Sequence, residues 1–148
     1  MKPLIVLLCV GAVTACAGDG TGLDEFGNPI GADGGGGAGA SLTADVQPIL
    51  SENCALAGCH AGTSPAQQQN LSAGQTAMNV VNVPALELST MMRVRPGQPD
   101  SSYLVHKIQG THASVGGQGG RMPLGQAALS ATEIQVIRTW IAEGAADN

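Results

Sequence analysis

The chain has 148 residues, which is enough for one domain once any processed or tethering segment is set aside. Phe26, Tyr103 and Trp140 are its only aromatic residues, so either a large bound apolar group fills the core or the core is small and rich in Ala and Gly. The formal net charge is −5 and no cluster of basic residues occurs, which argues against nucleic acid as a partner.

The first 15 residues have the pattern of a secretory signal. A short charged start is followed by an apolar stretch over residues 3–13, which is shorter than the ~20 residues that a membrane-spanning helix needs. Val13-Thr14-Ala15-Cys16 resembles the lipobox of bacterial lipoproteins, in which the cysteine becomes the acylated first residue. We therefore expect residues 1–15 to be removed and Cys16 to carry the lipid. The alternative is an ordinary signal cleaved at small residues.

Either form of processing places the protein outside the cytoplasm. Acyl chains on one cysteine would anchor it to a membrane without a spanning helix. By the same resemblance, Ala17 after the cysteine favours the outer membrane, with the protein facing the periplasm or the cell surface.

Residues 16–41 are expected to form the lipid-attachment cysteine and a tether. Ala17 to Ala40 is rich in glycine, including Gly34 to Gly37, and has few large apolar residues. Such a stretch cannot bury enough surface to offset the entropy of ordering it. The folded domain is therefore predicted over residues 42–148.

A helix is predicted from about residue 42 up to Cys54. Thr43 is a suitable N-cap, and Asp45 in the first turn would face the positive end of the helix dipole. Apolar residues recur at helical spacing and form one face: Val46, Ile49 and Leu50.

The helix leads directly into Cys54-Ala-Leu-Ala-Gly-Cys59-His60. Two cysteines followed by a histidine are the core of the c-type haem attachment signature, C-x-x-C-H. In that chemistry each thiol adds across one vinyl group, and the adjacent imidazole reaches the iron. Here four residues separate the cysteines instead of two, so the loop must bulge, and Gly58 can supply the freedom. The alternative is a disulfide between Cys54 and Cys59 with an incidental histidine beside it.

Residues 61–100 show little periodicity and are expected to be mostly loop. Residues 77–88 fit a short helix or extended segments equally well. After a turn at residues 96–100, Ser101 or Asp100 is predicted to cap a short helix through Ile108 that directs Tyr103, Leu104 and Ile108 inward.

The glycine-rich residues 110–121 predict a flexible loop, and a well-marked helix closes the chain. Ser130 and Glu133 form a capping box, and Leu129 against Ile134 would form its hydrophobic staple. The apolar stripe of this helix comprises Ile134, Ile137, Trp140 and Ile141, and Gly144 is expected to end it.

An iron bound by His60 would have a second axial position. The methionine thioether is the usual choice in electron-transfer cytochromes and raises the reduction potential. The candidates are Met78, Met91, Met92 and Met122, with His106 and His112 as nitrogen alternatives. Met122 is the best placed, because a glycine-rich loop can carry it across a cofactor and Pro123 favours an extended backbone before it. We expect His106 to be solvated and His112 to be polar filler in a mobile loop.

Taken together, residues 42–145 resemble a class I c-type cytochrome domain. The matching features occur in order: a helix entering Cys54…Cys59-His60, then Pro99-Asp-Ser-Ser-Tyr103-Leu104, then Arg121-Met122-Pro123, then the closing helix with its capping box. The resemblance implies an all-α fold, a small cytochrome c-like arrangement of helices wrapped around one haem with long loops.

The resemblance also implies roles for particular residues. Cys54 and Cys59 would hold the haem covalently, with His60 as the proximal iron ligand and Met122 as the distal one. The first and last helices would cross beside the haem, which places Val46, Ile49 and Leu50 against Ile137 and Trp140.

Further residues are weaker candidates for contacts with such a group. Pro65 is a candidate to accept a hydrogen bond from the other nitrogen of His60. The indole N–H of Trp140 and the exposed charges of Arg93, Arg95 and Arg121 are candidates for haem propionates.

The expected function is one-electron transfer outside the cytoplasm, with redox proteins and a membrane as partners. With both axial positions filled, the iron would offer no site for a substrate, so no enzyme is predicted. Two alternatives remain open: a redox-inert lipoprotein binding module stapled by a Cys54–Cys59 disulfide, and a haem enzyme or gas sensor in which Met122 leaves the iron free.

Overall fold

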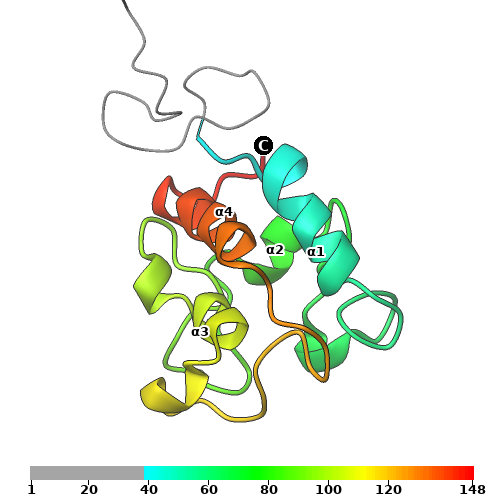
Figure 1. Ribbon diagram of the computed structural model, residues 1–148, viewed down its shortest axis with the longest axis vertical. Coiled ribbons are helices and arrows are strands. Elements are labelled where there is room, and N and C mark those ends of the chain that lie inside the picture. Colours follow the sequence, from blue (N-terminus) through cyan, green and yellow to red (C-terminus); the bar gives the residue numbers. More distant parts are fainter. Residues whose placement is uncertain (1–38) are drawn as a thin grey trace, which may run out of the picture. The chain divides into compact units, whose positions relative to one another are not determined.

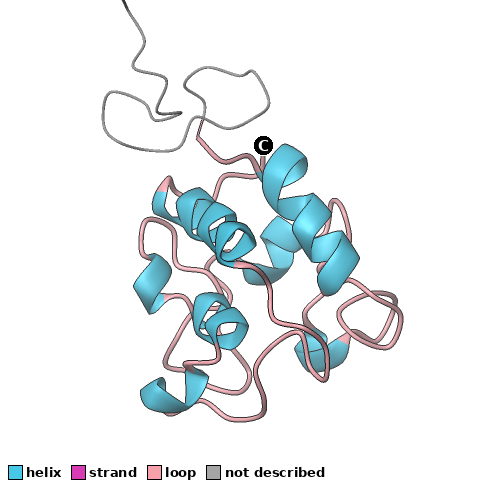
Figure 2. Cartoon of the chain, viewed as in Figure 1, coloured by secondary structure: helices cyan, strands magenta, loops and turns pink. Residues whose placement is uncertain are grey.

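The structure, a computed structural model, describes residues 39–148, and this part of the chain is mostly helical. The predicted signal, Cys16 and all but the last residues of the predicted tether lie outside the described residues. Four α-helices and four shorter helical turns follow one another, joined by long loops (Figure 2). In order they are η1 Leu42–Val46, α1 Gln47–Asn53, η2 Ala66–Gln68, α2 Thr76–Val80, η3 Pro99–Ser101, α3 Tyr103–Gln109, η4 His112–Val115 and α4 Ala131–Ala142.

The prediction of an all-α domain is confirmed at this level. Within residues 39–148, strand-like pairing is limited to isolated bridges, such as Val81 with Val94 and Pro84 with Met92. These bridges join residues 81 and 84, in the segment that the sequence left undecided, to residues 94 and 92. The undecided segment forms most of the five-residue helix α2 and then a series of turns and bends.

The N-terminal helix, which is η1 followed directly by α1, begins at Leu42 as predicted, but a different residue caps it. Its cap is Ser41, not the predicted Thr43: the Ser41 hydroxyl accepts from the amide of Ala44 at 3.2 Å, and the Ser41 amide donates to Asp45 at 2.7 Å. Asn148 explains this start, because its backbone oxygen accepts hydrogen bonds from the Ser41 hydroxyl and the Thr43 amide. The two ends of the described chain are thus tied together.

The start of α3 also differs from the prediction. Neither Asp100 nor Ser101 caps it, since both lie in the preceding turn η3, and the N-cap position is Ser102. The Ser102 hydroxyl is used elsewhere: it accepts from the amide of Arg95 and donates to the carbonyl oxygen of Gln98, each at 2.9 Å. The Ser102 hydroxyl is therefore engaged by the preceding loop and does not cap α3.

Helix α4 agrees closely with its sequence signals. The Ser130 hydroxyl accepts from the amide of Glu133 at 3.2 Å, and the Glu133 carboxylate accepts from the amide of Ser130 at 2.7 Å, which completes the capping box. These hydrogen bonds hold the pKa of Glu133 below its usual value.

The hydrophobic core lies where α4 meets the N-terminal helix and α3 (Figure 1). The first and last helices were expected to pack together, and their apolar residues do share one core cluster. The members that are at most 1% exposed include Val46, Leu50, Ile137 and Trp140. The indole N–H of Trp140 donates to the carbonyl oxygen of Ala146 at 2.8 Å, and the ring takes no part in the cavity described below. The candidate role of Trp140 toward a propionate is therefore not supported.

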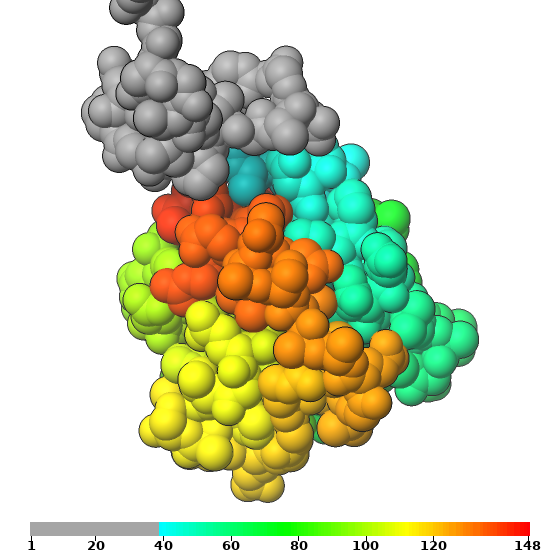
Figure 3. All heavy atoms as spheres, viewed as in Figure 1, coloured from blue at the N-terminus to red at the C-terminus, as the bar shows by residue number. Residues whose placement is uncertain are grey.

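On the face drawn in Figure 3, the N-terminal helix, α3 and α4 form one closely packed surface. Among the described helices, none is both long and apolar enough to cross a membrane.

The capping box of α4 should contribute measurably to stability. We expect Ser130→Ala to lower the free energy of unfolding by about 1 kcal/mol, because the amide of Glu133 loses its acceptor. Urea unfolding followed by circular dichroism measures the change. Thr132→Ala in the first turn of the same helix is the matched control and should cost less. Equal losses for the two variants would contradict the capping role.

Candidate functional site

A mostly apolar cavity brings together three of the four residues predicted to bind a cofactor. Cys54, His60 and Met122 all line it, although they come from the end of α1, the following loop and the segment before α4. Helix α3 forms one wall with Tyr103, Leu104, Lys107 and Ile108. The cavity volume is about 50 Å³. This is well below the ~300–1,000 Å³ typical of sites for small molecules and cofactors, so a large group would have to widen the cavity.

The loop between the two cysteines bulges as the sequence predicts. Gly58 has a φ of +79°, a conformation that favours glycine. The amide of Cys59 donates to Leu56 at 2.9 Å, and the amide of His60 donates back to the carbonyl oxygen of Cys54 at 3.1 Å. The His60 bond spans the widened spacing, so the extra residues do not carry the histidine away from the first cysteine.

The fourth predicted residue, Cys59, is half-buried and does not line the cavity. Both Cys54 and Cys59 are free thiols. Burial is the main cause that raises the pKa of Cys54 to about 11, and the nearby Cys59 and Glu133 act in the same direction.

The imidazole of His60 is held through one nitrogen. Nδ1 lies 3.1 Å from the carbonyl oxygen of Ala66, one residue beyond the predicted Pro65. A carbonyl oxygen can only accept, so Nδ1 carries the proton and Nε2 is left with its lone pair. Burial lowers the pKa of His60 and so favours the neutral ring. The hydrogen bond to Ala66 acts in the opposite direction but is the weaker effect. A neutral histidine with a free Nε2 is the form that binds a metal.

The loop that holds His60 is itself held by Arg93. Gln67 and Gln68 have φ values of +54° and +51°, which are unfavourable for residues with a side chain. The Arg93 guanidinium donates to the carbonyl oxygens of Gln67 at 2.7 Å, Gln68 at 3.2 Å and Asn79 at 2.7 Å. These bonds hold the strained turn in place next to His60.

Arg93 differs from the exposed loop charge that the sequence suggested. It is 4% exposed and lines the cavity, whereas Arg95 and Arg121 do not line it. Within residues 39–148, the two ion pairs are Lys107 with Glu87 and Arg138 with Asp100, so Arg93 has backbone partners but no carboxylate. A buried cation without a counter-ion favours an anionic group in the cavity.

Of the candidates for a second ligand, only Met122 lines the cavity. Met78 is 70% exposed, and Met91 and Met92 are half-buried elsewhere. Both ring nitrogens of His106 are engaged, Nδ1 with Thr111 and Nε2 with the carbonyl oxygen of Asp100.

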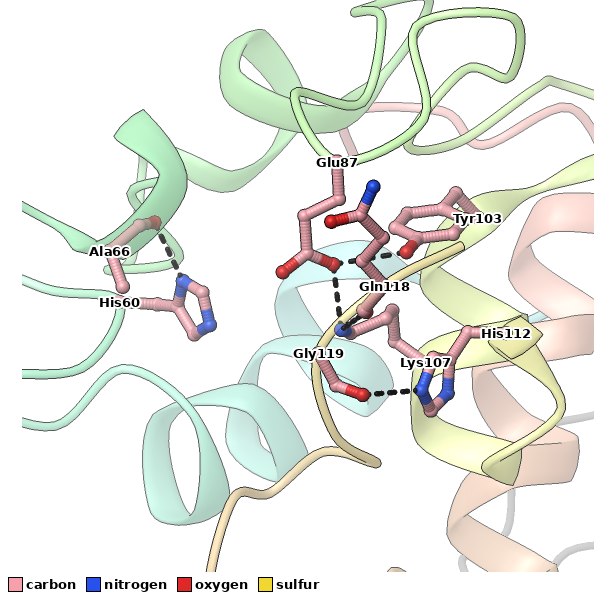
Figure 4. Close-up of polar contacts among 8 residues, drawn as sticks. All are labelled: His60, Ala66, Glu87, Tyr103, Lys107, His112, Gln118 and Gly119. Carbon is pink, nitrogen blue, oxygen red and sulfur yellow. Dashed lines mark hydrogen bonds and ion pairs between the residues drawn. The ribbon is translucent and has the colours of Figure 1, made fainter. Parts of the chain in front are cut away.

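His112 is not the mobile, polar residue that the sequence suggested. It lies in η4 and is 7% exposed, and its Nε2 donates to the carbonyl oxygen of Gly119 at 2.9 Å. Its Nδ1 is buried and has no hydrogen-bond partner. The ring points toward the carbonyl oxygen of Gly119 and so fastens the glycine-rich loop to the turn that follows α3 (Figure 4).

A buried polar cluster that the sequence did not reveal forms part of the cavity wall (Figure 4). Lys107 Nζ lies 2.7 Å from Glu87 Oε2, which also accepts from the Tyr103 hydroxyl at 3.0 Å. Burial works to raise the pKa of Glu87, but the hydrogen bonds from Lys107 and Tyr103 outweigh it and lower the pKa. Burial and the bond to Glu87 raise the pKa of Tyr103 to about 12.

One signal in the sequence pointed to Lys107. It lies four residues after Tyr103 and three after Leu104, so it shares the inward face of α3 with them. No comparable signal marks Glu87, which lies in a segment without periodicity.

In residues 39–148, no three side chains of His, Cys, Asp or Glu are grouped so that they could hold a metal ion by themselves. Comparisons with protein-family models, with curated proteins and with solved structures each found no match.

The two thiols should differ in reactivity when both are free. A pKa of about 11 in place of 9.0 makes the thiolate of Cys54 ~100-fold scarcer at pH 8, and its burial limits access further. We expect iodoacetamide to label Cys59 well before Cys54, as measured by peptide mass spectrometry over time. In urea both should react at similar rates. Equal labelling in native buffer would contradict the buried position of Cys54.

Proposed function

We propose that residues 42–148 form a c-type cytochrome domain that transfers electrons outside the cytoplasm, with one haem attached through Cys54 and Cys59. The observation that carries this proposal is the meeting of Cys54, His60 and Met122 at one mostly apolar cavity. Cys54 and His60 belong to one short motif, and Met122 lies 62 residues after His60, so the fold and not the motif brings the methionine to the cavity.

Three features of the cavity fit a haem. Its apolar lining suits the porphyrin ring, and the free Nε2 of His60 is available to the iron. The guanidinium of Arg93, buried without a carboxylate partner, suits an acidic substituent such as a propionate. Two features require adjustment: the cavity, about 50 Å³ in volume, must widen to take a haem, and the Cys59 thiol must turn toward it, because the Cys59 side chain does not line it.

Each residue has a defined task in this proposal. The haem supplies an iron that exchanges one electron between its ferrous and ferric states. His60, oriented by the carbonyl oxygen of Ala66, and Met122 would each supply one ligand to this iron. Leu71, Leu104 and Ile108 keep water away from the site. With both axial ligands supplied by the chain, we propose a carrier and not an enzyme.

The proposal extends to the N-terminal part of the chain. Lipidation at Cys16 would tether the domain to a bacterial membrane, most simply the outer one, within reach of redox partner proteins. The fold is proposed to be cytochrome c-like, in keeping with its helical content and with the contact between its first and last helices.

The first test is covalent attachment. In a host with haem-maturation machinery, we expect the exported protein to retain its pigment in acidified acetone. Its pyridine haemochrome spectrum should be that of a haem with two saturated vinyl groups. Cys54→Ser/Cys59→Ser should lose all covalent pigment, because both thioether bonds need a thiol.

Cys16→Ser is the matched control for loss of a cysteine. It should keep the haemochrome spectrum and lack the acyl mass by mass spectrometry. A colourless native protein whose mass is two hydrogens below that of the free thiols would instead establish the inert module stapled by a Cys54–Cys59 disulfide.

The second test concerns the distal ligand. We expect Met122→Ala to let carbon monoxide bind the reduced protein rapidly. Its reduction potential should fall by on the order of 0.1 V, within the ~0.8 V that axial ligands span. Redox titration and spectroscopy measure both effects.

Met91→Ala and Met92→Ala are matched controls, since neither side chain lines the cavity. Both variants should resemble the native protein. Rapid binding of carbon monoxide by the native protein would favour a gas sensor or haem enzyme over a carrier.

A further inference from the structure

Lys107 holds the segment that carries Met122 at both of its ends. Its side-chain Nζ donates to the carbonyl oxygen of Gln118 at 3.0 Å. Its own backbone carbonyl oxygen accepts from the amide of Met122 at 2.9 Å. One residue of α3 therefore fixes the start and the end of a five-residue stretch.

The stretch between these two bonds is closely fitted to the polar cluster. A Cβ atom on Gly119 would lie 3.1 Å from Glu87 Oε1 and 3.3 Å from Lys107 Nζ, and the φ of Gly119 is +74°. The carbonyl oxygen of Gly119 accepts from His112. The glycine-rich loop that the sequence marks as flexible is therefore pinned along its length.

The direction of the Lys107 ammonium depends on Glu87. The side chain of Lys107 is 8% exposed, and Nζ lies 2.7 Å from Glu87 Oε2 and 5.8 Å from the centre of the Tyr103 ring. Figure 4 shows Nζ between the Glu87 carboxylate and the backbone at Gln118. The Glu87 side chain is 19% exposed, so the ion pair is largely but not completely shielded from water.

From these contacts we propose that Lys107, oriented by Glu87, is a positioning residue that sets Met122 at the distal side of the haem. This inference rests on the proposed function. It adds that the ion pair of Lys107 and Glu87 in the cavity wall controls the strength of the bond between Met122 and the iron. Neither Lys107 nor Glu87 needs to contact the iron for this effect.

The test compares haem-loaded variants by the sulfur-to-iron charge-transfer band of the ferric protein. Lys107→Met keeps a long side chain but loses the bond to Gln118. We expect covalent haem content to stay at the native level, the band to be lost as in Met122→Ala, and the reduced protein to bind carbon monoxide. An unchanged band in Lys107→Met would overturn the proposal.

A double variant separates positioning from the burial of a lone charge. Lys107→Met leaves the partly buried Glu87 without its cation, whereas Glu87→Gln/Lys107→Met removes both charges. We expect the double variant to regain thermal stability without regaining the band, because the bond to Gln118 is still missing. Recovery of the band would mean that only the unpaired carboxylate mattered, and would overturn the proposal.

Amide hydrogen exchange supplies a readout that does not need the haem. In the protein with free thiols, Lys107→Met should speed exchange at Met122 roughly tenfold, since one hydrogen bond anchoring the loop is lost. Arg138→Met, which breaks the more exposed ion pair with Asp100, is the matched control and should leave that amide unchanged. Equal exchange in the two variants would overturn the proposal.

The two proposals fail in distinguishable ways. A native protein without covalent haem would refute the proposed function, while the exchange experiment would still test whether Lys107 holds the Met122 segment. A native protein with haem and an unaltered Lys107→Met spectrum would refute the positioning role alone.

Discussion

The buried guanidinium of Arg93 connects the parts of the structure that form the cavity. Its side chain donates to three backbone carbonyl oxygens, two in the strained turn after His60 and one at the end of α2. Its backbone amide donates to Val83, and its carbonyl oxygen accepts from the amide of Leu104 in α3. A buried cation is tolerated only when it is hydrogen-bonded, so these segments are constrained to meet at this point.

The cavity has two walls of different character. One is apolar and belongs to the hydrophobic core around Leu104 and Ile108. The other contains Arg93 and the cluster of Glu87, Tyr103 and Lys107. The apolar wall suits a flat hydrophobic group, while the polar wall holds the loops on either side of it. If the proposed haem is present, the same polar contacts govern both of its axial ligands, His60 through Arg93 and Met122 through Lys107.

Local sequence patterns predicted which segments are helical better than they predicted which residues cap the helices. The capping box of α4 is found as expected, because Ser130 and Glu133 need only each other. The caps of the N-terminal helix and of α3 were predicted wrongly, at Thr43 and at Asp100 or Ser101. Asn148 accepts hydrogen bonds from the Thr43 amide and from the Ser41 hydroxyl that caps the N-terminal helix. At α3, the loop at Arg95 takes the Ser102 hydroxyl that a local cap would use. Such partners are distant in the sequence and leave no periodic trace.

The sequence by itself determined the helical class of residues 39–148 and the bulge at Gly58. It also supplied the candidate ligands, three of which, Cys54, His60 and Met122, line the cavity. Periodicity, capping and the spacing of reactive side chains are local properties, which can be recognised in the sequence before the fold is known. Only the tertiary structure decided that Met122 and not another methionine lines the cavity, that Arg93 and Lys107 are buried, and that Ala66 orients His60. The burial of a charge depends on which distant carbonyl and carboxylate groups surround it, and that is settled by packing.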